Sequence, residues 1–221
     1  MTRPDALALA RAERVDLLAL LHDLDEGDWD RPTLCSEWTV RDVVTHVLSF
    51  EGVGWGAVLA HGLRRLLPGG GRGPLEGPLG PMDAVNEPPR PRHDPALLVA
   101  TLAGHLTPTG LTAGFGGRIA LTDGLIHQQD LRRPLGRPRT IPAERLRAAL
   151  SFAMYAPPVG AFRRVRGLRL VATDLDWSHG RGALVTGPGE ALLLAAAGRA
   201  VALPELEGEG LERLASRMPA A

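Results

Sequence analysis

Three side chains from two separate segments have the residue types and the spacing of a divalent-metal site. His46 lies in the segment 38–46, WTVRDVVTH, whose apolar residues recur at helical spacing. Asp123 and His127 stand four residues apart in a second helical segment, so they share one helix face. If His46 reaches the same point, two imidazoles and one carboxylate form a set that holds a divalent metal and leaves coordination positions open.

Simpler interpretations of the same residues stay open at this stage. A lone histidine on an amphipathic helix is usually a core or surface histidine, and an Asp–His pair at i, i+4 is common on helix surfaces. Asp130 returns to the same face seven residues after Asp123. Its carboxylate either orients a metal-bound histidine or forms an ion pair with a neighbouring arginine.

The remaining chemistry-bearing residues give weaker signals. We expect Trp38 to anchor the start of its helix in the core and Cys35 to be a small buried residue rather than a nucleophile. Because Cys35 is the single cysteine, no disulfide can form within the chain. The other histidines have no ligand-like spacing: His22, His61, His93, His105 and His179.

Apolar periodicity and capping residues predict the elements that must position these side chains. We expect helices over 5–26, from Thr39 to about 50, and in a third stretch to about 67, followed by helices at 94–105, 115–133 and 141–155. Thr39 with Asp42 three residues later indicates a capping box, and Asp94 before Pro95 indicates a second clean helix start.

The segment 68–95 is rich in proline and glycine, which is typical of a stretch without regular structure. Its length favours either a functional lid over the site or a disordered connection. Its arginines, Arg72, Arg90 and Arg92, could pair with a substrate carboxylate or simply be solvated.

The last third of the chain has a different pattern of apolar residues. Alternating residues at 168–173 and the run 182–186 predict two short strands, and 190–198 and 211–218 predict helices. We therefore divide the chain into a helical bundle over 1–157 and a small α/β domain over 158–221.

Bulk composition limits the partners. The 25 basic residues, all arginine, balance 25 acidic ones, which argues against nucleic acid or an anionic membrane as partner. The chain has no run of 18 apolar residues, so we expect no membrane span. Its first residues carry charges throughout, so we expect no signal peptide and a cytoplasmic protein.

Two motifs and the C-terminal region resemble a known family. Residues 32–48, PTLCSEWTVRDVVTHVL, resemble the first metal-binding motif of the mycothiol-dependent maleylpyruvate isomerase family, within the DinB-like metalloenzyme superfamily. Residues 123–136, DGLIHQQDLRRPLG, resemble its second motif, in which a carboxylate and a histidine stand four apart and an aspartate follows three later. Residues 167–199 are similar to its small C-terminal domain.

The resemblance implies a mainly α fold, with a DinB-like four-helix bundle followed by a sterol-carrier-like α/β domain. It implies His46, Asp123 and His127 as ligands of Zn²⁺ or another divalent metal, although the family usually has Glu where this chain has the shorter Asp123. It further implies mycothiol as thiol cosubstrate and an isomerase or S-transferase reaction on a small electrophile similar to maleylpyruvate. We expect a monomer or homodimer with small-molecule partners.

Two other functions remain open on the sequence. One is a non-catalytic DinB-like protein that binds a metal or a small ligand, which the shorter Asp123 favours. The other is a metal-dependent hydrolase, for which Asp130 is the only candidate general base.

Overall fold

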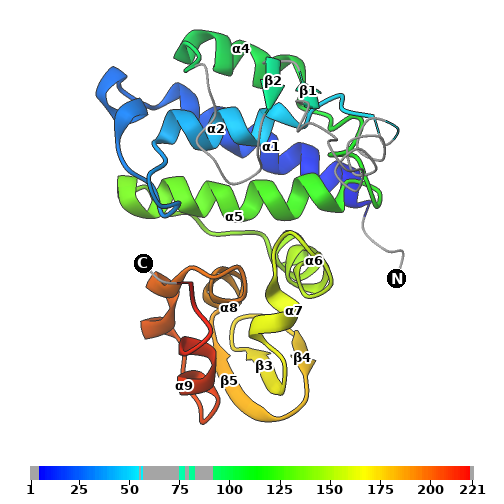
Figure 1. The fold of residues 1–221 in the computed structure, drawn as a ribbon, viewed down its shortest axis with the longest axis vertical. Helices are drawn as coiled ribbons and strands as arrows, with labels where there is room; N and C mark the ends of the chain where they lie inside the picture. Colours follow the sequence, from blue (N-terminus) through cyan, green and yellow to red (C-terminus); the bar gives the residue numbers. More distant parts are fainter. Residues whose placement is uncertain (1–4, 55, 57–74, 78–79, 83–91, 220–221) are drawn as a thin grey trace, which may run out of the picture. The chain divides into compact units, whose positions relative to one another are not determined.

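The computed structural model describes residues 5–54, 56, 75–77, 80–82 and 92–219 (Figure 1). The chain forms two compact units, Met1–Pro138 and Arg139–Ala221. The first unit ends before α6, Ala143–Ala153, which packs against α8, Gly189–Ala196, within the second unit. The boundary between domains that we expect after residue 157 stays a prediction.

Four helices build the core of the first unit within its described residues: α1 (Ala6–His22), α2 (Val40–Ser49), α4 (Pro95–Gly104) and α5 (Arg118–Leu135). Helices α1 and α2 each pack against both α4 and α5 (Figure 1). The short 3₁₀ helix η1, Glu26–Asp30, precedes α2. The predicted mainly helical fold class is confirmed, and the buried cluster includes Leu17, Leu21, Val43, Val47, Leu98, Leu102 and Leu131.

The predicted start of α2 is confirmed in detail. The Thr39 N–H donates to Asp42 Oδ2 at 2.9 Å, and the Asp42 N–H donates to Thr39 Oγ1 at 3.3 Å. Each side chain thus satisfies a backbone N–H that has no partner inside the helix. Helix α4 likewise begins after Asp94 with Pro95 at its first position.

The expectation that 68–95 lacks regular structure is wrong for part of that segment. Strands β1 (Leu75–Gly77) and β2 (Gly80–Met82) pair antiparallel, with Gly77 opposite Gly80. Edge strands tolerate proline and glycine, here Gly77, Gly80 and Pro81, so their abundance did not exclude a strand pair. The predicted helix to about residue 67, together with His61, Arg72 and Arg90, lies outside the described residues.

The second unit contains a three-stranded sheet. Strands β3 (Leu168–Ala172), β4 (Ser178–Gly180) and β5 (Ala183–Gly187) are arranged in the order β4-β3-β5, with β3 antiparallel to β4 and parallel to β5. Strand β4 was not predicted, because three polar or glycine residues carry no alternating pattern. Helix α8 is buried along its whole apolar run, and the smaller elements are α7 (Ala161–Arg164), η2 (Ala200–Glu205) and α9 (Leu211–Ala215).

None of the helices in the described part of the chain combines the length and the apolarity that crossing a bilayer requires.

Candidate metal centre

The structure brings the three sequence-predicted residues together. His46 projects from the last turns of α2, and Asp123 and His127 project from one face of α5. One ligand atom from each residue lies within 4.8 Å of the other two. The His46 and His127 rings meet edge to face with centroids 5.0 Å apart. Two segments separated by more than seventy residues thus converge on one point.

The spacing of these donor atoms suits a tetrahedral ion. His127 Nε2 and Asp123 Oδ1 are 3.5 Å apart. Two ligands bound to zinc at about 2.0–2.1 Å with tetrahedral angles stand roughly 3.3 Å from each other. The shorter carboxylate of Asp123 therefore reaches His127, and the distance between these two donor atoms is close to that between two ligands of one tetrahedral ion.

Asp130 holds the other nitrogen of the His127 ring. Its Oδ2 lies 2.9 Å from His127 Nδ1, a hydrogen-bond distance, and its side chain is wholly buried. A proton on Nδ1 leaves the lone pair of Nε2 directed toward Asp123, which is the tautomer a metal requires. This is the contact that the first interpretation of Asp130, as the residue that orients His127, requires.

The charges of the cluster shift two pKa values in opposite directions. Burial acts to lower the pKa of His127, but the carboxylates of Asp123 and Asp130 raise it well above its ordinary value. Burial acts to raise the pKa of Asp123, whereas the neighbouring His127, with smaller contributions from His46 and Arg14, lowers it. The carboxylates of the site thus stabilise a positive charge that lies between them.

Aromatic rings enclose the His46 side of the cluster. Trp38 lies edge to face with the His46 ring at a centroid distance of 5.0 Å, and Phe50 does so at 5.3 Å. Trp38 is buried, as predicted for a core anchor, but it also fixes a site residue. The cluster is open to solvent at Asp123, whose side chain is 35 % exposed, whereas that of His127 is 12 % exposed.

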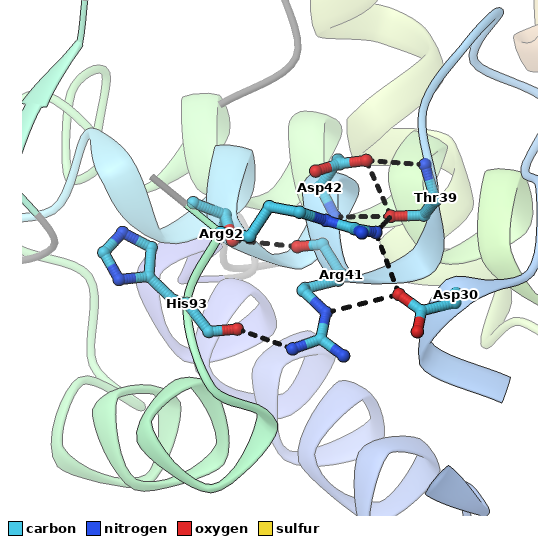
Figure 2. A network of polar contacts seen from close by, with 7 residues as sticks. Asp30, Thr39, Arg41, Asp42, Arg92 and His93 are labelled. Atoms are coloured by element: carbon cyan, nitrogen blue, oxygen red, sulfur yellow. Dashed lines mark hydrogen bonds and ion pairs between the residues drawn. The ribbon is translucent and has the colours of Figure 1, made fainter. Parts of the chain in front are cut away.

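Arg92 forms an ion pair with a carboxylate of the chain itself. The Arg92 guanidinium donates to Asp30 Oδ1 at 2.8 Å and to Thr39 Oγ1 at 3.4 Å, and Arg41 donates to the carbonyl of His93 at 2.9 Å. Figure 2 shows this network at the start of α2. Arg41 Nε also lies 3.5 Å from Asp30. These contacts fasten residues 92–93 to the start of α2, the helix that carries His46.

Cys35 is a site neighbour that sequence reasoning missed. Its thiol lies 3.2 Å from Asp130 Oδ2 and 3.9 Å from His127 Nδ1. The sequence signal was indirect: Pro134 follows Asp130 by four residues and has no N–H to donate to the Asp130 carbonyl, which accepts from the Leu34 N–H of the Cys35 loop. Of the other described histidines, His22 is exposed, and His105 Nδ1 bonds to the carbonyl of Thr101 at 2.8 Å.

The fold and the site define a class: a helical bundle with a histidine–carboxylate cluster, joined to a small α/β unit. Residues 10–132 match the family described as mycothiol maleylpyruvate isomerase N-terminal domain. The chain belongs to this family, as its motifs predicted, and the matched span contains the whole cluster.

Two solved structures are similar to the chain over nearly its full length. Both are crystal structures of mycothiol-dependent maleylpyruvate isomerase, one of them a histidine-to-alanine mutant. Each is 18 % identical, covers 95 % of this chain and 93 % of its own, and superposes with a TM-score of 0.58 for the mutant and 0.55 for the other. At this identity the similarity establishes the fold. No curated protein matches the chain.

Proposed function

We propose that the chain is a divalent-metal-dependent and mycothiol-dependent enzyme, an isomerase or S-transferase that acts on a small electrophile similar to maleylpyruvate. The observation that carries the proposal is the convergence of His46, Asp123 and His127 within 4.8 Å. Family membership supports the thiol and the class of reaction.

A divalent ion bound to these residues would supply Lewis acidity that deprotonates an incoming thiol and holds the thiolate. The thiolate would add to one carbon of an electrophilic double bond, and the resulting single bond would allow rotation; expulsion of the same thiolate would then re-form the double bond in the other geometry. If the adduct instead took up a proton at the neighbouring carbon and kept its C–S bond, the reaction would be S-transfer.

The chain's own residues prepare the site for this chemistry. Asp130 keeps the proton of His127 on Nδ1, so that Nε2 stays a lone-pair donor. Trp38 and Phe50 hold the His46 ring from two sides and keep water from it. The exposed side of Asp123 gives a thiol and an electrophile their approach.

The direct test is zinc content and thiol-dependent turnover of the untagged protein, compared with His46→Ala. We expect about one zinc per chain in the parent, isomerisation of maleylpyruvate only when mycothiol is added, and loss of both in the variant. His22→Ala is the matched control, because His22 is exposed at the end of α1. A parent that binds no added zinc would contradict the proposal.

A non-catalytic metal-binding member of the family is the second candidate, and the shorter Asp123 is the feature that favours it. Zinc bound at His46 and His127 without turnover of any thiol and electrophile would support it. A hydrolase has less support, since Asp130 is wholly buried and already accepts hydrogen bonds from His127 and Cys35, and so it is not free to act as a general base.

A further inference from the structure

A proline near the end of α5 creates the attachment for a loop from the other site helix. Pro134 has no N–H, so the carbonyl of Asp130, four residues earlier, loses its helical partner. The N–H of Leu34 donates to this carbonyl at 3.1 Å. The loop 33–38, which leads into α2, is thereby bound to α5 at the residue that orients His127.

Local hydrogen bonds then fix the shape of the loop and the direction of the Cys35 side chain. The Cys35 N–H donates to Thr33 Oγ1 at 3.1 Å, and the Thr33 hydroxyl donates to the carbonyl of Trp38 at 3.0 Å. The Thr33 N–H donates to the same carbonyl at 3.1 Å. As a result the Cys35 thiol lies 3.2 Å from Asp130 Oδ2.

The contacts at Asp130 Oδ2 have the geometry of hydrogen bonds rather than of a second metal site. Cys35, His127 and Asp130 also gather their ligand atoms within 4.8 Å. However, Asp130 Oδ2 and His127 Nδ1 are 2.9 Å apart, which is shorter than the roughly 3.3 Å between two ligands of one tetrahedral zinc. The same oxygen therefore accepts from the Nδ1–H of His127 and the S–H of Cys35.

We propose that Cys35 is a positioning residue of the metal centre: its thiol holds the Asp130 carboxylate in the orientation that directs His127 Nε2 toward the metal position. The inference rests on the proposed function. The thiol is a weak donor, but the Asp130 side chain is wholly buried, so a partner lost there is not replaced by bulk water. Cys35 contacts neither substrate nor metal in this arrangement.

The test is zinc affinity, measured by competition with a chromophoric chelator, for the parent, Cys35→Ala and Cys35→Ser. Partners that orient a metal-bound histidine change affinity by about 10–100-fold, and for this weak donor we expect about a tenfold loss in Cys35→Ala. Cys35→Ser keeps a donor and should recover affinity to within about threefold of the parent. Ser36→Ala, an exposed change in the same loop, should leave affinity unchanged.

Substitution with Co²⁺ separates positioning from direct ligation. We expect no thiolate-to-cobalt charge-transfer absorption in the parent, and a ligand-field spectrum that shifts in Cys35→Ala and returns in Cys35→Ser. A charge-transfer band that disappears in Cys35→Ala would make Cys35 a ligand and overturn the inference. Equal zinc affinity in the parent and Cys35→Ala would also overturn it while leaving the proposed function intact. A parent protein that binds no zinc would contradict both this inference and the proposed function.

Discussion

Replacement of Glu51 by alanine should destabilise the first unit by about 3–5 kcal/mol, the cost of leaving one partner of a buried ion pair uncompensated. Glu51 Oε2 lies 2.6 Å from Arg14 Nη2, and the two side chains are 0 % and 4 % exposed. The carboxylate also accepts from the hydroxyls of Thr109 and Thr112 at 2.7 and 2.9 Å and from the Thr109 N–H. The variant therefore leaves the buried charge of Arg14 uncompensated and removes the acceptor of three further donors.

The measurement is urea unfolding in metal-free buffer, followed by tryptophan fluorescence in a Trp177→Phe background. Trp177 is the only tryptophan of the second unit, so the remaining three report on the first. Arg14→Met combined with Glu51→Leu removes both charges. We expect this double variant to be clearly more stable than the sum of the single losses predicts, because neither charge is then left unpaired.

Arg92→Ala is the matched control, since it removes an ion pair of similar length whose side chains are both exposed. Arg92 and Asp30 are 2.8 Å apart but 55 % and 56 % exposed, and such pairs contribute about 0–1 kcal/mol. If Glu51→Ala cost no more than Arg92→Ala, burial would not govern the energetics of these pairs and the reasoning would be refuted.

Three further predictions concern the site, the second unit and a close backbone contact. Asp130→Asn should weaken zinc binding about 10–100-fold in a chelator competition, because a neutral amide orients the His127 ring less strongly than a carboxylate; unchanged affinity would contradict this. Burial lowers the pKa of His179, so the folded state is unaffected at high pH and is destabilised relative to the unfolded chain as pH falls from the ordinary histidine pKa toward the lower folded pKa; its ring protons should titrate at lower pH in the folded protein than in urea. Gly117→Ala should cost at least about 1–3 kcal/mol in urea unfolding, since φ is +89° and a Cβ would meet backbone of α1 at 2.7 Å, whereas Gly104→Ala, with open space, should be neutral or stabilising.

Local patterns were sufficient to predict the elements of the site but not their meeting. The capping box of Thr39 and Asp42 and the four-residue step from Asp123 to His127 depend only on helix geometry, and both hold in the structure. That His46 meets them depends on how α2 packs on α5, which no spacing within either helix encodes. The family resemblance supplied that long-range information.

The role of the loop before α2 was hidden for the same reason. Cys35 was expected to be a small buried residue, and its contact with Asp130 follows from a backbone bond between segments almost a hundred residues apart. The sequence does contain the cause, because Pro134 removes the N–H that would otherwise occupy the Asp130 carbonyl. Recognising this cause requires knowing which distant N–H donates to the Asp130 carbonyl in place of the missing one.

The geometry of the site depends on two sets of backbone contacts, one at each end of the pair formed by α2 and α5. Before α2, the Leu34 N–H binds the Asp130 carbonyl near the end of α5. After α2, Glu51 pairs with Gly110 in the segment that precedes α5, and the Leu111 N–H donates to the Val53 carbonyl at 2.7 Å. The two helices therefore run antiparallel and are hydrogen-bonded to each other's flanking segments at both ends. These contacts fix the position of His46 along α5. Under the proposed function this fixed separation matters for Asp123, because its carboxylate is one methylene shorter than that of Glu and could not follow a helix that moved.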